Sequence, residues 1–218
     1  SRLSNEDLSN ENFRFMRSRQ MTVAGLDAKV VRVSFTGDLG YEIYVSEDEQ
    51  VALYQALLDA GQELNVRPVG SRALMSLRLE KGYGSWGREY SPEYWPQEVG
   101  LDRLIKLDKE EEFLGKQAYI DLKDRAPREK LVILSVDTPH NADPVGGEPI
   151  FSKAGAYIGR VSSGGYSYTT EQGLALGFLK APFCEPGHEV DVAALGLPHA
   201  ARVLGEAPFD PTGTRLRS

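Results

Sequence analysis

Residues 29–45 read KVVRVSFTGDLGYEIYV, two runs in which apolar and polar residues alternate, joined by a glycine-containing turn. A period of two is typical of a half-buried β-strand, because successive side chains point to opposite faces. The segment TGDLG supplies residues that tolerate positive φ, so the stretch predicts a β-hairpin. The side chains expected to face the core are Val31, Val33 and Phe35 in the first run and Tyr41, Ile43 and Val45 in the second.

Two helices are predicted after this hairpin. Ser46 and Glu49 have the spacing of a capping box, and apolar residues then recur at helical intervals, which predicts a helix over residues 47–60. A second helix is predicted in SRALMSLRLEKG, residues 71–82, where Gly82 offers the stop. The recurring residues of the first helix are Val51, Tyr54, Leu57 and Leu58, up to a terminating Gly61, and the second helix carries Arg72, Arg78 and Glu80 at its more polar positions.

The pattern changes after Gly82. Residues 83–96, YGSWGREYSPEYWP, are too irregular for a helix and too rich in proline for a central strand, which indicates an ordered loop. Residues 113–124 predict a short helix, and the charged stretch 125–130 predicts a domain boundary. From Leu131 onward, short apolar runs alternate with Gly and Pro turns. The expected fold class is α+β, with an antiparallel sheet and helices in residues 1–125 and a small antiparallel β-barrel or sandwich in residues 130–218.

Composition excludes several classes of function. The 218 residues carry a formal net charge of −7 and no basic stripe, which argues against a nucleic-acid partner. There is no apolar run long enough for a membrane span and no targeting segment, so we expect a cytoplasmic location, or the mitochondrial matrix in a eukaryote. The single cysteine, Cys184, predicts no internal disulfide and no metal site. Phosphate-loop, dinucleotide and nucleophile-elbow motifs are also missing from the sequence, so we expect no flavin or nicotinamide site within it.

A few side chains could hold a flat, charged ligand. Glu42 follows the turn and points away from the apolar face of its strand, so its carboxylate meets either solvent or a ligand with paired N–H donors, such as a pteridine. Arg72 and Arg78 could each bind a ligand carboxylate, the alternative being a surface ion pair. Tyr83 and Trp86 could stack on a planar ligand, or they could simply hold their own loop in place.

Several long blocks resemble the folate-binding domain of the glycine cleavage T-protein (aminomethyltransferase) family. These blocks are SFTGDLGYEIYV at 34–45, the stretch LMSLRLEKG to FLGKQA at 74–118, and IGRVSSGGYSYTTEQGLALGFL at 158–179. SLRLEKGYGSWG and FDPTGTRLR are more similar to the C-terminal domain of the dimethylglycine and sarcosine dehydrogenase branch. The resemblance implies tetrahydrofolate as cofactor, with FAD only in a separate domain of a longer protein. It also implies that the chain is part of the T-protein folate-binding fold.

The resemblance also assigns roles to residues. In the family, the acid of the GYE block binds the pteridine, and Glu42 occupies that position here. The arginine of the RLE block contacts the folate tail, and Arg78 occupies that position. Phe35 replaces a common tyrosine, so only packing or stacking is expected there. The role of Arg72 stays open.

The family's catalytic aspartate belongs to an earlier stretch, so no catalytic residue is assigned here and the N-terminal part of the domain, or of a longer parent chain, is an expected partner. Two hypotheses remain. One is a tetrahydrofolate-binding part of an enzyme that transfers an aminomethyl or methylene group. The other is a non-catalytic folate-fold module for regulation or protein interaction.

Overall fold

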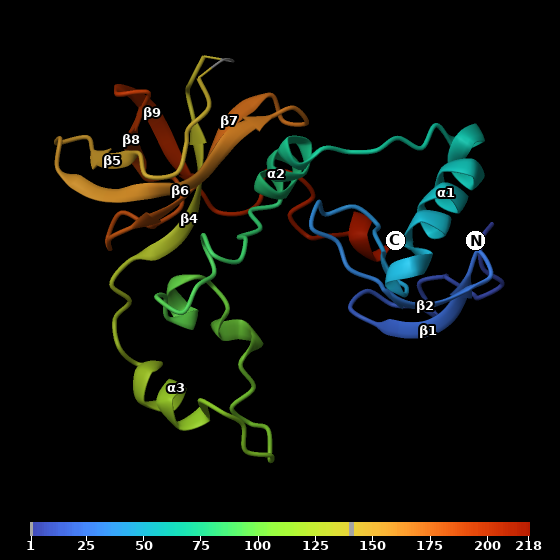
Figure 1. Ribbon diagram of the computed structural model, residues 1–218. Helices are drawn as coiled ribbons and strands as arrows, with labels where there is room; N and C mark the ends of the chain where they lie inside the picture. The colour runs from blue at the N-terminus through green and yellow to red at the C-terminus, as the bar shows by residue number, and fades with distance from the viewer. Residues whose placement is uncertain (1, 140–141) are drawn as a thin grey trace. The chain divides into compact units, whose positions relative to one another are not determined.

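The computed structural model describes residues 2–139 and 142–218 and divides them into two compact units (Figure 1). The first unit comprises residues up to Arg78 together with Asp210–Ser218, and the second comprises Leu79–Phe209. The division falls inside helix α2 (Ser71–Glu80). The sequence-based boundary at residues 125–130 stays a prediction.

A three-stranded antiparallel sheet forms the centre of the first unit. Its order is β1 (Ser18–Val23), β2 (Leu26–Val31) and β3 (Glu42–Tyr44), with Val31 opposite Glu42. The predicted hairpin between residues 29 and 45 is confirmed by this pairing. Strand β1 was not predicted. It is joined to β2 through Ala24 and Gly25, both at positive φ, as a tight two-residue hairpin turn requires.

The predicted inward face of the first run is wrong. Strand β2 already begins at Leu26, and its alternation buries Ala28 and Val30 and continues to Arg32, which is only 1% exposed. Phe35 is instead 37% exposed. Buried Arg32 is compensated by hydrogen bonds from Nη1 to the Phe13 carbonyl at 2.6 Å and from Nη2 to the Ser218 carbonyl at 2.8 Å. In the second run, Tyr41, Ile43 and Val45 pack against the core as predicted.

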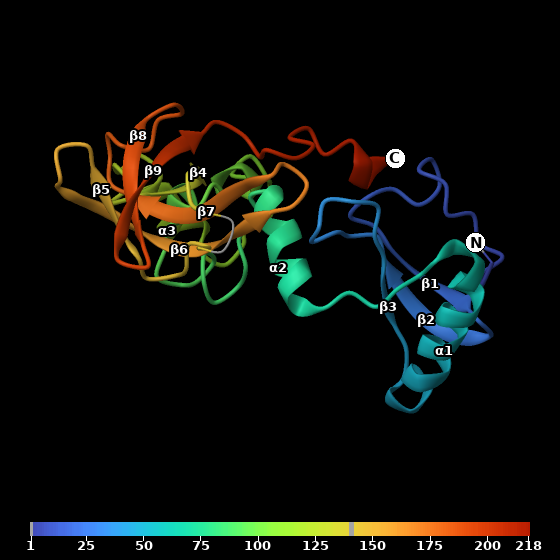
Figure 2. The same cartoon turned by 90° about the horizontal axis from the view of Figure 1, so that it is seen from above.

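Helix α1 (Gln50–Gly61), preceded by the 3₁₀ turn η1 (Glu47–Glu49), confirms the first predicted helix and covers one face of the sheet (Figures 1 and 2). Its start differs from a capping box, because the Ser46 hydroxyl bonds the Glu49 carboxylate rather than a backbone N–H. Only Leu53 and Gly61 of α1 are buried, whereas Val51 and Tyr54, two of the apolar residues that recur at helical spacing, are exposed. A 3₁₀ turn, η2 (Gln62–Leu64), follows.

Helix α2 confirms the second predicted helix, but its last turn is not polar surface. Arg78 and Glu80, predicted at polar positions, are each about 1% exposed. The ordered loop beyond α2 contains one isolated bridge between Trp86 and Tyr90, and short turns follow. These are η3 (Pro96–Glu98) and η4 (Asp102–Leu104), and the predicted short helix is α3 (Lys116–Leu122).

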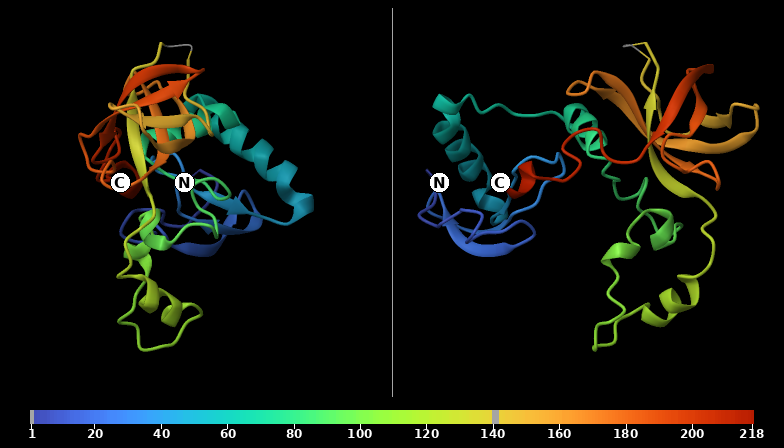
Figure 3. Two further views of the ribbon diagram at one scale, coloured as in Figure 1. Left: turned by 90° about the vertical axis from the view of Figure 1, so that its left-hand side faces the viewer. Right: turned by 180° about the vertical axis from the view of Figure 1, so that it is seen from behind.

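A closed antiparallel barrel, not a sandwich, forms most of the second unit (Figure 3, right). Its strand order is β4-β7-β6-β5-β8-β9. The strands are β4 (Lys130–Val136), β5 (Pro149–Ser152), β6 (Tyr157–Ser167), β7 (Gln172–Leu179), β8 (Glu189–Ala194) and β9 (Leu197–Leu204). Side chains such as Leu134 and Ile150 fill it, and Gly159 lets β6 approach the backbone of Phe178. The predicted α+β class is confirmed, and a last 3₁₀ turn, η5 (Arg215–Arg217), ends the first unit. Across the described residues, every helix is too short or too polar to cross a membrane.

Candidate functional site

Glu42 lies on the solvent face of β3, where its strand neighbour Tyr44 is also exposed. The Tyr44 hydroxyl donates a short hydrogen bond to Oε2 of Glu42. This bond raises the pKa of the Tyr44 hydroxyl, because the neighbouring carboxylate disfavours a second negative charge. A carboxylate offers about four lone-pair sites. One bond from Tyr44 therefore leaves Glu42 able to accept further N–H donors from a ligand.

The surroundings of Glu42 form an open polar surface. In the sheet register, Lys29 of β2 stands opposite Tyr44. A shallow depression of about 680 Å³ is lined by Tyr44, Lys29, Asp27 and Gln20, among others. A second depression, of about 300 Å³, lies between β3 and α1 and is lined by Tyr44 and Tyr54, among others. Tyr44 thus lines both depressions, and its hydroxyl is hydrogen-bonded to Glu42.

Phe35 and Arg78 belong to the same unit as Glu42 but differ in exposure. Phe35 lies in the β2–β3 loop with part of its ring exposed, which is compatible with stacking. Arg78 is buried at the end of α2 and has a partner within the protein. Arg72 lies exposed in the first turn of α2. Ligand roles for Phe35 and Arg78 stay predictions.

Tyr83 and Trp86 belong to the second unit and lie on the loop after α2. The Lys81 ammonium lies 5.9 Å from the ring centroid of Tyr83, a cation–π distance. Trp86 is 80% exposed, so it does not hold its loop by packing. Of the two aromatic candidates, Trp86 offers a free ring face, and stacking by either residue stays a prediction.

Three glutamates in residues 80–98 are fully buried, which the sequence does not reveal, and two of them, Glu80 and Glu89, bond this loop to the barrel. Glu80 accepts hydrogen bonds from Ser167 Oγ at 2.9 Å and Thr169 N at 3.1 Å. Glu89 accepts from the hydroxyls of Ser162 at 2.7 Å and Ser163 at 2.6 Å. These two serines are consecutive in β6, and the register shift between Val161 and Ser163 explains how both reach the same carboxylate.

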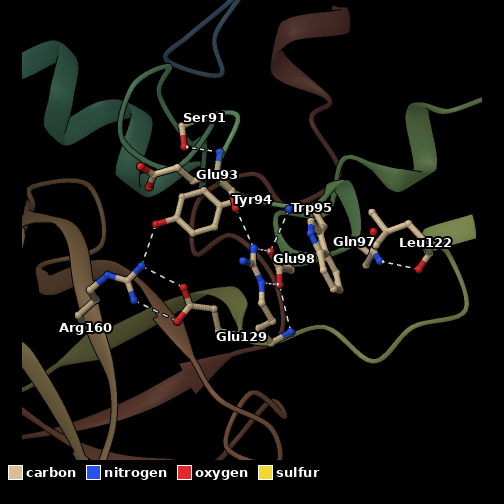
Figure 4. Close-up of polar contacts among 10 residues, drawn as sticks. Ser91, Glu93, Tyr94, Trp95, Gln97, Glu98, Leu122, Glu129 and Arg160 are labelled. Atoms are coloured by element: carbon tan, nitrogen blue, oxygen red, sulfur yellow. Dashed lines mark hydrogen bonds and ion pairs between the residues drawn. The ribbon is translucent and has the colours of Figure 1, made fainter. Parts of the chain in front are cut away.

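The third glutamate, Glu98, belongs to the polar network of Figure 4. It accepts bonds from Trp95 N and from the backbone and guanidinium of Arg128. Burial alone would raise the pKa of Glu98, but these bonds outweigh burial and the pKa is lowered. Beside it, Arg160 pairs with Glu129 at 2.9 Å and donates to the Tyr94 hydroxyl at 2.8 Å (Figure 4).

This network joins the loop after α2 to the barrel through Tyr94 and Arg160. The Tyr94 ring stacks on Phe178 of β7 with centroids 4.1 Å apart, so its hydroxyl and ring are both committed to the barrel. The charges of the network are paired, Glu98 with Arg128 and Glu129 with Arg160. Within residues 2–139 and 142–218, no group of three or more His, Cys, Asp or Glu side chains could hold a metal ion.

A sheet-and-helix unit followed by a closed barrel defines an aminomethyltransferase-like fold. The structure matches glycine cleavage system aminomethyltransferase T from Bartonella henselae with a TM-score of 0.80 at 26% identity, over 90% of this chain and 53% of that one. The GCVT N-terminal domain matches residues 1–109, and the glycine cleavage T-protein C-terminal barrel domain matches residues 129–210. The chain belongs to the glycine cleavage T-protein family, and the predicted resemblance is confirmed.

Relatives in this family are enzymes of two kinds. Dimethylglycine dehydrogenase of Rattus norvegicus is 37% identical over 218 residues, 99% of this chain and 25% of that protein. An aminomethyltransferase of Symbiobacterium thermophilum is 35% identical over 196 residues, 89% of this chain and 51% of that protein. The chain therefore spans about a quarter of the dehydrogenase and about half of the aminomethyltransferase.

Proposed function

We propose that this chain is the tetrahydrofolate-binding portion of an enzyme that transfers one-carbon units as aminomethyl or methylene groups. Membership of the T-protein family supports the reaction class. The observation that carries the proposal is Glu42, whose exposed carboxylate keeps acceptor sites beside the Tyr44 hydroxyl. A pteridine presents adjacent N–H and NH₂ donors, which two carboxylate oxygens can accept together.

The proposed division of labour within this chain is limited to binding. Glu42 orients the ring of the folate, and Phe35, partly exposed in the preceding loop, packs on it. Holding a reactant in one geometry lowers the entropy cost of the following chemical step. Proton transfer and any flavin chemistry are assigned to parts of a longer protein.

The proposed partner is that remaining portion of the family domain. Val51 and Tyr54 leave an apolar strip of α1 exposed to solvent, and β3 is an edge strand of its sheet. Such exposed apolar area and open strand edges are typical of surfaces covered by further protein. A nucleic-acid or membrane partner is not part of the proposal, and a cytoplasmic or mitochondrial-matrix location stays a prediction.

The test is calorimetric titration of tetrahydrofolate into the full-length protein and its Glu42→Gln variant. The amide replaces one acceptor oxygen with an NH₂ group aimed at ring donors. We expect a loss of about 1–3 kcal/mol, roughly tenfold or more in affinity. The matched control is Glu47→Gln, the same change at an exposed residue in η1, which should leave affinity unchanged.

Unchanged affinity in a folded Glu42→Gln protein would exclude the site and favour the non-catalytic module.

A further inference from the structure

Residues 210–218 form a hydrogen-bonded turn that leads into the 3₁₀ turn η5. Asp210 Oδ1 accepts hydrogen bonds from the Thr214 backbone at 3.0 Å and hydroxyl at 2.6 Å, and Oδ2 accepts from Arg215 N at 3.1 Å. Gly213 adopts φ +65°, and its N–H donates to the Asp210 carbonyl. A carboxylate that accepts several local N–H groups fixes the turn that leads into η5.

This segment lies beside the β2–β3 loop, residues 32–41, and two contacts join them (Figures 1 and 2). Leu216 is buried, with 2% of its surface exposed. Arg215 Nε lies 2.5 Å from Asp38 Oδ1. The Ser218 carbonyl accepts the hydrogen bond from buried Arg32 described above. One ionic contact and one hydrogen bond therefore join the segment to the loop, while the Leu216 side chain of the same segment is buried in the protein.

Arg32 makes the attachment costly to break. Its guanidinium is buried, and its Nε has no acceptor among the described residues, so the carbonyls of Phe13 and Ser218 supply its hydrogen-bond acceptors. Removal of the Ser218 carbonyl would leave a buried cation with less compensation, which is strongly unfavourable. The loop and the segment are thus coupled through Arg32.

The loop itself leads into the proposed ligand site. It carries Phe35, and β3 begins with Glu42 directly beyond it. Inside the loop, Gly37 N donates to Ser34 Oγ at 2.9 Å, and a Cβ on Gly40 would lie 2.8 Å from the Val33 carbonyl. The loop therefore has one compact path, and Asp38 is the point at which the 210–218 segment holds it.

We propose that residues 210–218 act as a brace that positions the β2–β3 loop, and through it Phe35 and Glu42, for ligand binding. This inference rests on the proposed function, and Arg215, Leu216 and Asp38 are positioning residues. Residues 211–218 lie beyond the two family matches, which end at residues 109 and 210.

The experiment measures hydrogen exchange of the backbone amides of residues 33–41 and tetrahydrofolate affinity in the same full-length variants. Leu216→Ala removes the buried anchor and should speed exchange at these amides at least about tenfold, with a similar loss of affinity. Arg215→Glu should produce a smaller change of about threefold, because the pair with Asp38 is exposed. The double exchange Arg215→Glu with Asp38→Arg should restore both readouts.

The control is Arg202→Glu, which breaks the exposed Arg202–Glu189 pair of the barrel at 2.8 Å. It should leave exchange at residues 33–41 unchanged. Unaltered exchange in both Leu216→Ala and Arg215→Glu overturns the brace, and so does faster exchange with unaltered affinity. If the parent protein binds no tetrahydrofolate, the proposed function fails, while exchange at residues 33–41 still decides whether the brace exists.

Discussion

Replacement of Glu98 by glutamine tests how strongly a buried carboxylate anchors η3 to the connection that leads into β4, because Glu98 bonds both Trp95 and Arg128. The Glu98 side chain is fully buried and accepts four hydrogen bonds. Two come from the backbone N–H groups of Trp95 at 2.9 Å and Arg128 at 3.0 Å. Two come from the Arg128 guanidinium at 2.8 and 2.7 Å. Glutamine keeps one acceptor oxygen and turns an NH₂ group toward these donors.

The size of the loss follows from the two kinds of donor. A hydrogen bond to a charged group contributes about 1.5–3 kcal/mol, and a buried pair that loses one partner costs about 3–5 kcal/mol. The Arg128 side chain is 54% exposed and can be rehydrated, which lowers the cost on its side. The hydrogen bond from Trp95 N is part-buried, so its N–H has less access to water than the Arg128 side chain. We therefore expect Glu98→Gln to destabilise the second unit by about 2–4 kcal/mol.

Urea unfolding followed by Trp95 fluorescence measures this loss. The sequence contains two tryptophans, so a Trp86→Phe background leaves Trp95, which lies under the Arg128 guanidinium, as the probe. A loss of this size should lower the urea midpoint by about 1–2 M. Glu93→Gln, at an exposed side chain nearby, is the control and should stay within about 0.5 kcal/mol. A midpoint for Glu98→Gln equal to that of the control would refute the anchoring role.

Two further predictions concern the second unit. The pKa of Glu98 is lowered in the folded state, so the ionised carboxylate should stabilise the fold fully above the usual glutamate pKa of about 4.3. This stabilisation should disappear as the pH falls through the lower folded pKa. The difference in unfolding free energy between wild type and Glu98→Gln, measured by urea unfolding, should therefore shrink below about pH 5. A Cβ on Gly159 would lie 2.0 Å from the Phe178 carbonyl, whereas a Cβ on Gly165 would lie 3.4 Å from the Leu79 side chain. In thermal unfolding, Gly159→Ala should therefore lose about 3 kcal/mol of unfolding free energy and Gly165→Ala less than about 1 kcal/mol. Equal losses in the two variants would contradict the close approach of the strands at Gly159.

Local periodicity was sufficient to predict most of the elements. The 29–45 hairpin, helices α1, α2 and α3, and the β-rich second half all follow from spacing and turn residues. The stripe of α1 was predicted less well, since Val51 and Tyr54 are exposed. Periodicity shows that one face is apolar, but it does not show whether this chain supplies the surface that covers that face.

Burial of charge could not be predicted in the same way. Alternation placed Arg32 outside, because a strand pattern assigns polar residues to solvent unless a partner is known. Its acceptors, Phe13 and Ser218, are 19 and 186 residues away in the sequence. Glu80 and Glu89 likewise depend on serines of β6 that are 87, 73 and 74 residues away. Partners at such separations leave no local signal.

These distant partners determine how the aromatic loop is held. Tyr83 and Trp86 lie between Glu80 and Glu89, and both glutamates are bonded to β6. A buried carboxylate that loses its donors costs several kcal/mol, so the two ends of the loop are fixed to the barrel more strongly than its exposed tip. The exposed ring of Trp86 therefore lies on a loop whose two ends are fixed to the barrel. A ligand that contacts Trp86 would need only the tip of this loop to move, with both ends staying bonded to β6.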